Sequence, residues 1–158
     1  MRKFCLAAAL SLLLCMPVMA EQWAYEGGTT PIAWFDNGPA QFQFACRGGQ
    51  LAMGFWVRAP ESSVAKATVL SLAITPDPAA GTGTSFAQDM PLVHLEGASM
   101  IIRGPVARQW ARIAQGARED IRIAFVRQAA TGFETFDTQI FGAKGSKSMI
   151  AQVLDKCG

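Results

Sequence analysis

Four cysteines and one histidine are the residues of this chain best suited to redox or metal chemistry. Cys5 and Cys15 fall in an apolar N-terminal stretch, which leaves Cys46 and Cys157 for the rest of the chain. No Cys-x-x-Cys pair occurs, and His94 has no second histidine with which to share a metal. We therefore expect no metal site and no cofactor, and we expect Cys46 and Cys157 to pair if the chain enters an oxidising compartment.

Hydroxyl and carboxylate groups give no convincing catalytic set. Ser63 and Lys66 have the Ser-x-x-Lys spacing of penicillin-recognising enzymes, but the other motifs of those enzymes are missing. We expect no catalytic residue. The alternative is a small hydrolase acting on envelope glycans or peptides, in which Ser63, His94, Glu119 and Asp120 would have to converge.

A group of arginines is the strongest candidate for binding. Six lie within twenty-five residues, with only two acids among them: Arg103, Arg108, Arg112, Arg118, Arg122 and Arg127. Such an excess predicts a cationic surface for an acidic protein, an anionic lipid or an anionic glycan. The alternative is a solvated helix face and a charged strand that discourages aggregation.

Aromatic residues offer a second candidate surface. Trp34 and Trp56 are the two that we would test as parts of a sugar-binding face. Aromatic residues in strands more often belong to the core, and this alternative stays open.

The N-terminus predicts where these residues operate. Arg2 and Lys3 precede an apolar run over residues 4–15, Pro17 interrupts it, and Ala20 ends a stretch of small residues. This layout is typical of a secretory signal peptide over residues 1–20. We expect a periplasmic or secreted protein, and no later stretch is apolar enough for an integral membrane segment.

Length and charge limit the choice of partner. Residues 21–158 suit one domain, and no internal repeat is present. The net charge of +2 disappears with Arg2 and Lys3, so the remaining chain is formally neutral. We therefore expect no nucleic-acid partner and predict a protein or an envelope component instead.

Most of the elements that must position these residues are predicted strands. The clearest is a hairpin with Phe42, Phe44 and Cys46 on one face and a Gly-Gly turn. Residues 76–91 are rich in Pro and Gly and predict a mobile loop. The expected strands cover residues 32–36, 41–46, 51–58, 66–75, 92–95, 99–103, 121–127 and 133–141.

Two helices complete the expected fold. The first opens at Gly104-Pro105 and ends at Gly116, with Val106, Trp110 and Ile113 inward and Arg108 and Arg112 outward. The second starts at a capping serine, Ser146 or Ser148, and directs Cys157 to its packed side. The pattern predicts a mainly β, antiparallel β-sandwich-like domain with two short helices, the second at the C-terminus.

The C-terminal sequence carries a resemblance. The run from Phe136 to Ser146, followed by Met149-Ile150, Val153 and Cys157, resembles the tails of invasion-associated locus B-like proteins and of periplasmic type VI secretion accessory proteins. This resemblance implies a β-sandwich-like periplasmic protein without assigning any catalytic residue.

The function expected from the sequence is a non-catalytic periplasmic or secreted binding or accessory protein at the bacterial envelope. The alternatives are the small hydrolase and an accessory factor in secretion or host interaction.

Overall fold

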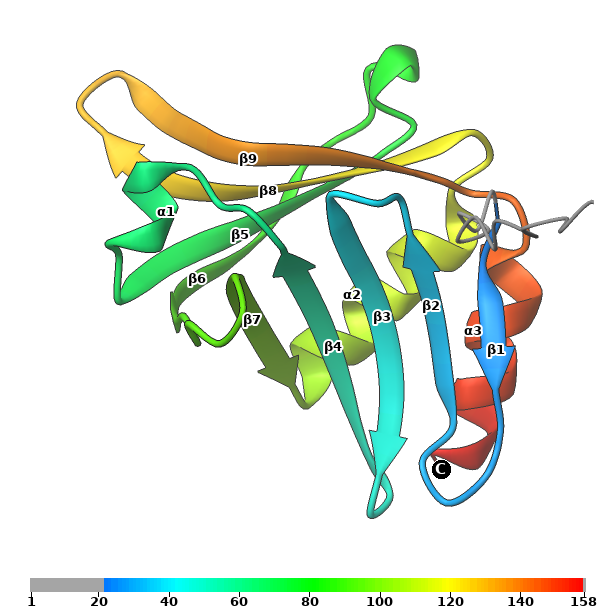
Figure 1. Cartoon of the computed structure of the whole chain (residues 1–158). Helices are drawn as coiled ribbons and strands as arrows, with labels where there is room; N and C mark the ends of the chain where they lie inside the picture. The colour runs from blue at the N-terminus through cyan, green and yellow to red at the C-terminus, as the bar shows by residue number, and fades with distance from the viewer. Residues whose placement is uncertain (1–21, 158) are drawn as a thin grey trace, which may run out of the picture.

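A computed structural model describes residues 22–157, which form two antiparallel sheets and three α-helices (Figure 1). The mainly β, sandwich-like fold is therefore confirmed. The signal peptide predicted over residues 1–20, with Cys5 and Cys15, lies outside the described residues.

The first sheet, sheet A, contains the predicted hairpin. Its strands in spatial order are β1 (Ala24–Glu26), β2 (Ile32–Asp36), β3 (Ala40–Arg47), β4 (Gln50–Val57) and β7 (Ala98–Arg103). Gly48 and Gly49 make the β3–β4 turn at φ values of 57° and 77°, which L-residues with a side chain rarely adopt. The turn sets Phe42 opposite Phe55 and Phe44 opposite Met53, with all four side chains buried.

The second sheet, sheet B, corrects the prediction of a mobile loop over residues 76–91. Its strands in spatial order are β6 (Ser85–Pro91), β5 (Val69–Pro76), β8 (Asp120–Ala129) and β9 (Gly132–Gly142). The loop prediction is wrong over residues 85–91, because β6 pairs with β5 despite its polar composition and buries Ala87. Residues 77–84 form the connection between the two strands, with a short 3-10 helix at Pro78–Ala80. Pro76 and Pro91 stand at strand ends, where a missing N–H is tolerated.

Two neighbouring expectations also need correction. The strand predicted from Lys66 begins at Val69, because the short helix α1 (Ser62–Ala65) precedes it. The strand predicted over residues 92–95 is reduced to an isolated bridge between Val93 and Ser99.

Helices α2 (Pro105–Gly116) and α3 (Ser146–Lys156) confirm the two predicted helices, α3 being the C-terminal one. The predicted serine cap of α3 is wrong: Gly145 is the N-cap, in the left-handed conformation, and no side chain caps the helix. The Ser146 hydroxyl instead donates to the carbonyl oxygen of Ala114, which ties α3 to α2.

The buried face of α2 also differs from the prediction. Val106 is exposed, whereas Trp110 and three alanines are buried: Ala107, Ala111 and Ala114. Small side chains allow the helix to approach the sheet closely, a packing requirement that a search for large apolar residues overlooks.

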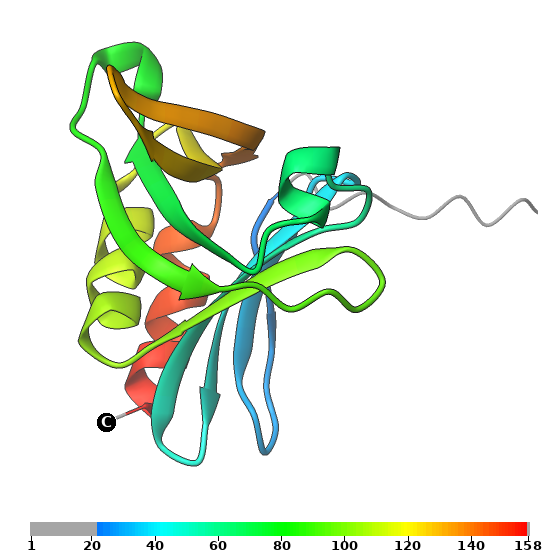
Figure 2. The same ribbon diagram turned by 90° about the vertical axis from the view of Figure 1, so that its left-hand side faces the viewer.

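The core fills the space between the inner face of sheet A, the inner face of sheet B and the two long helices. In Figure 1 the strands of sheet B cross those of sheet A, and α2 and α3 lie behind sheet A. Figure 2 shows the helices on a single side of sheet A. Trp23 lies where these layers meet, packed on the rings of Phe35, Phe42 and Phe44.

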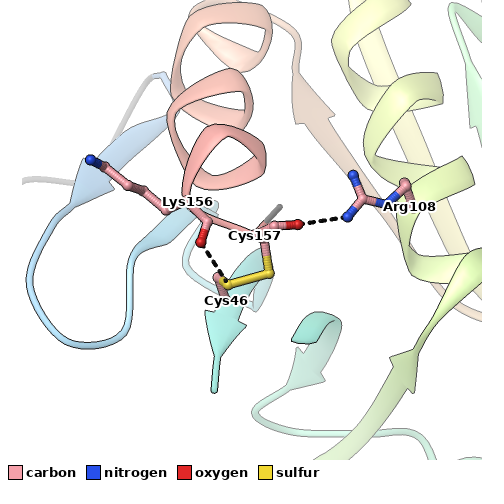
Figure 3. Close-up of a disulfide and its surroundings, with 4 residues drawn as sticks. All are labelled: Cys46, Arg108, Lys156 and Cys157. Atoms are coloured by element: carbon pink, nitrogen blue, oxygen red, sulfur yellow. Dashed lines mark hydrogen bonds between the residues drawn. A yellow bond between two sulfur atoms is a disulfide. The ribbon is translucent and has the colours of Figure 1, made fainter. Parts of the chain in front are cut away.

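The predicted disulfide joins β3 to the end of α3. Cys46 and Cys157 are bonded, are 111 residues apart in the sequence and are both buried (Figure 3). Arg108 does not face away from the protein as expected, since its guanidinium donates to the carbonyl oxygen of Cys157 at 2.7 Å. The C-terminal helix is thus fastened by a covalent bond and a charged hydrogen bond.

Candidate binding site

One face of sheet A is left uncovered by the fold. Figure 1 looks onto this outer face, and no described helix lies in front of β2, β3 or β4. Because side chains alternate along a strand, the buried Phe42 and Phe44 direct Gln41 and Gln43 outward, and Ala45 follows them. The outer face is therefore built from the polar and small residues of a strand whose large residues form the core.

Strand register arranges the outward side chains in rows. The central row is Trp34, Gln43, Gly54 and Ile101, and the row above it is Asp36, Gln41, Trp56 and Ser99. The row below is Ile32, Ala45, Ala52 and Arg103. Trp34 and Trp56 thus share one face of the sheet, as a shared binding surface requires.

Two adjoining hollows run along β4 on this face. One, of about 410 Å³, includes Gln41, Trp56 and Leu95 in its lining, and the other, of about 200 Å³, extends to Arg47 and Arg103. They share Gln43, Gly54 and Ile101 and form one groove, called the trough below. Trp34 is on the same face but is not among the residues that line it.

Small residues form the floor of the trough, and the side chain of Gln43 packs over the central one, Gly54. Gly54 lies at its centre, and a Cβ added there would come within 3.2 Å of Cγ of Gln43. Ala45 and Ala52 continue the floor toward Arg103. A larger residue at position 54 would fill the trough and displace Gln43.

The upper end of the trough is apolar and rigidly held. The indole nitrogen of Trp56 donates to the carbonyl oxygen of Glu96 at 3.1 Å. Gly97 follows at a φ of 126°, and a Cβ there would overlap the carbonyl oxygen of Val57. These contacts hold the connection before β7 against Trp56, so that Leu95 reaches the trough.

Arg58 and Asp36 form an ion pair at this upper end. The Arg58 guanidinium binds both carboxylate oxygens of Asp36 and lies 4.5 Å from the ring centroid of Trp56. The ion pair neutralises Arg58 and Asp36, and the arginine covers part of Trp56.

The lower end is cationic. Arg47 and Arg103 both line it, both are exposed, and neither forms an ion pair with any residue in the range 22–157. No acidic residue lines either hollow. The trough therefore passes from an apolar end to a positively charged one.

Two amides form the polar wall between the ends. The amide nitrogen of Gln41 donates to the amide oxygen of Gln43 at 3.0 Å. This bond fixes the orientation of both side chains and leaves the amide nitrogen of Gln43 facing Gly54, with no acceptor among residues 22–157.

The six predicted arginines do not form one surface. Arg103 lines the trough, whereas Arg122 lies on the outer face of sheet B, in a hollow with Thr75. Arg127 pairs with Glu134 at 2.7 Å. The remaining three belong to α2 and the residue pair that follows it: Arg108, Arg112 and Arg118. The excess of positive charge in this stretch is divided among three surfaces because the chain turns from strand to helix to strand.

The groups of the hydrolase alternative are also separated. Ser63 lies on α1, the ring nitrogen of His94 is 2.7 Å from the carbonyl oxygen of Ala67, and Glu119 and Asp120 lie where β8 begins. The last two donate backbone N–H groups to Asp77, and no hydrogen bond within residues 22–157 joins Ser63, His94 and either carboxylate.

One carboxylate elsewhere has a raised pKa. Burial raises the pKa of Asp137, and the nearby charge of Glu61 acts in the same direction. Asp137 accepts the backbone N–H of Glu61, and Glu61 accepts that of Asp137. These reciprocal bonds tie α1 to β9, and this structural role accounts for both side chains.

Sequence reasoning missed most of the trough. Arg103 and Trp56 were among the predicted candidates, but Gln43, Gly54 and Leu95 were not. Gln43 was detectable, because it alternates with the core residues of β3, whereas Leu95 reaches the face only through the irregular connection held by Gly97.

Within residues 22–157, no three His, Cys, Asp or Glu residues are grouped as a metal site would require. The same range contains no helix of the length and hydropathy needed to cross a bilayer. No family model matches the chain, and neither a curated protein nor a solved structure is significantly similar to it.

Proposed function

We propose that the chain is an exported, non-catalytic binding protein of the bacterial envelope and that it holds its ligand in the trough of sheet A. The observation that carries this proposal is the trough itself. It combines a floor of small residues, a rigid aromatic wall and two unpaired arginines on a face that no described element covers.

Export is supported by two independent features. The first twenty residues have the composition of a signal peptide. The Cys46–Cys157 bond is of the kind that persists in oxidising compartments and is rare in the cytosol. The resemblance of the C-terminal residues to periplasmic proteins points to the same compartment.

A binding role is favoured over hydrolysis by the chemistry of the trough. Its lining contains amides, apolar side chains, arginines and the hydroxyl of Ser99, but no carboxylate, histidine or cysteine. These groups can recognise a ligand and neutralise its charge, whereas general acid–base catalysis requires a side chain that exchanges protons near neutral pH.

The test is retention of envelope components by the oxidised protein and by a variant with a filled trough. Gly54→Leu places a side chain on the floor, and Gly83→Leu is the matched control because the space around Gly83 is open. The protein is immobilised and incubated with solubilised envelope extract. Retained lipids, glycans and peptides are then identified by mass spectrometry.

Wild type and Gly83→Leu should retain the same component, and Gly54→Leu should lose most of it. Thermal unfolding establishes that each variant is folded. Ile101→Gln is a second variant that alters the wall of the trough. It is chosen because the Ile101 side chain is 40% exposed. Equal retention by every variant, or none by wild type, would overturn the proposal.

A further inference from the structure

The apolar end of the trough exposes several large hydrophobic side chains next to one another. Leu95 is 75% exposed, Val93 50% and Ile101 40%, and all three line the same hollow beside Trp56. A contiguous apolar patch bordered by polar groups is typical of an interaction site. The ligand therefore has an apolar part.

The backbone of the trough argues against an added peptide strand as the ligand. β4 lies between β3 and β7, so its backbone groups are used within the sheet and cannot pair with a ligand strand. The amides of Gln41 and Gln43 share one hydrogen bond, and the amide nitrogen of Gln43 remains available to a polar group of the ligand. An aliphatic chain needs no hydrogen bonds and suits the apolar lining at Trp56, Leu95 and Ile101.

Arg47 and Arg103 define the other end of the ligand. Neither is paired within residues 22–157, and no acid lines the trough, so a negatively charged group would meet complementary charge there. Guanidinium groups bind carboxylates and phosphates with paired hydrogen bonds.

The separation of the two ends gives the ligand its minimum size. Trp56 and Ala52, the β4 residue opposite Arg103, are four residues apart. At a rise of about 3.3 Å per residue, this spacing is about 13 Å. A chain that reaches from Trp56 to the arginines must therefore be extended and long.

From this charge complementarity and length we infer that the trough binds an amphipathic anion: an extended acyl or alkyl chain along Trp56, Leu95 and Ile101, with a carboxylate or phosphate head group at Arg47 and Arg103. The inference rests on the proposed function and specifies the ligand class of the same site. A free fatty acid and an acylated phosphate of the envelope share this chemistry.

The experiment titrates the oxidised protein with dodecyl phosphate and with dodecanoate, each below its micelle concentration, by calorimetry and tryptophan fluorescence. Dodecyl maltoside supplies the same chain with a neutral head. Comparison of dodecyl phosphate with dodecanoate distinguishes an acylated phosphate from a free fatty acid as the ligand. Trp56 lines the trough and serves as its fluorescent reporter.

Wild type should bind at least one anionic probe more tightly than dodecyl maltoside. The double variant Arg47→Gln/Arg103→Gln should weaken that binding by about tenfold or more, because two charge-assisted contacts are lost. Its affinity for dodecyl maltoside should not change. Arg112→Gln/Arg118→Gln is the matched control, with the same loss of charge away from the trough, and should behave as wild type.

Leu95→Ser and Gly54→Leu test the end of the trough that is proposed to bind the aliphatic chain. Both variants should weaken the binding of the anionic probes and of dodecyl maltoside. Equal binding by all variants would show general adsorption of amphiphiles and would overturn the inference, as would no binding by wild type. If Gly54→Leu loses the retained envelope component but wild type binds neither dodecyl phosphate nor dodecanoate, only the proposed ligand class is wrong. If no variant affects retention, the proposed function itself is wrong.

Discussion

Two buried tryptophans show how differently one residue type is used in the same core. Trp23 and Trp110 are 2% and 0% exposed. The indole nitrogen of Trp23 donates to the carbonyl oxygen of Gly142 at 3.0 Å, whereas that of Trp110 has no partner among the described residues. The first tryptophan joins the N-terminal segment to β9, and the second packs α2 at the cost of an unsatisfied donor.

We predict different costs for the same substitution at these two positions. Trp23→Phe loses packing and a hydrogen bond and leaves the Gly142 carbonyl without its donor. Trp110→Phe loses similar packing but removes an unsatisfied N–H. Trp23→Phe should therefore lower the free energy of unfolding by about 1 kcal/mol more than Trp110→Phe.

Chemical denaturation of both variants with the disulfide intact measures this difference. Similar losses for the two, or a larger loss for Trp110→Phe, would show that the Trp23 hydrogen bond does not contribute to stability.

At the scale of elements, the connection between β5 and β6 is held by one carboxylate. Asp77 accepts backbone N–H groups of Glu119, Arg118 and Asp120, and these bonds, that of Glu119 first, hold the pKa of Asp77 below its ordinary value of 3.8. The carboxylate thereby fixes the start of β8 relative to the end of β5.

This lowered pKa predicts how stability depends on pH. A depressed pKa in the folded state stabilises the protein fully above 3.8, and the contribution disappears as the pH falls through the lower folded value. Asp77→Asn suits the left-handed backbone at φ 43° but lacks the charge. It should be less stable than wild type at pH 7, and the difference should shrink in acid.

Urea unfolding of both proteins between pH 7 and pH 2 measures the difference. A difference in the free energy of unfolding that stayed constant over this pH range would show that ionisation of Asp77 is not the source of the stabilisation.

Elements with strong periodicity could be predicted from the sequence, and elements fixed by distant partners could not. The β3–β4 hairpin follows from alternation and the Gly-Gly turn, and α3 from its apolar spacing. β6 was missed because its pairing with β5, rather than any preference of residues 85–91, makes it a strand.

The same reason explains how much of the candidate site was predicted. Trp56 and Arg103 were identified by residue type. The trough itself depends on the alignment of β3, β4 and β7, and β7 is separated from β4 in sequence by α1, β5 and β6. Such a register is a property of the folded chain and is not encoded in any short pattern.

At the scale of the whole molecule, the disulfide links the centre of sheet A to the last helix. Its loop spans most of the described domain, with a sequence separation of 111. In the chain-entropy model such a loop stabilises the folded state by about 4 to 5 kcal/mol. This is a large share of the roughly 5–15 kcal/mol typical of a domain.

We predict that Cys46→Ala/Cys157→Ala lowers the free energy of unfolding by about 4 kcal/mol and lowers the melting temperature accordingly. Arg108→Gln, which loses only the hydrogen bond to Cys157, should cost much less. Calorimetry of both variants, with reduced wild type as an independent comparison, provides the measurement. A double variant as stable as oxidised wild type would mean that packing of α3 alone maintains the fold.

The two cysteines of this covalent link are made at different times, because Cys157 follows Cys46 by 111 residues. Cys46 must stay reduced while the ribosome adds all of sheet B and both long helices. Oxidation is therefore a late step in the maturation of the protein, and an oxidant that acted earlier would give Cys46 the wrong partner.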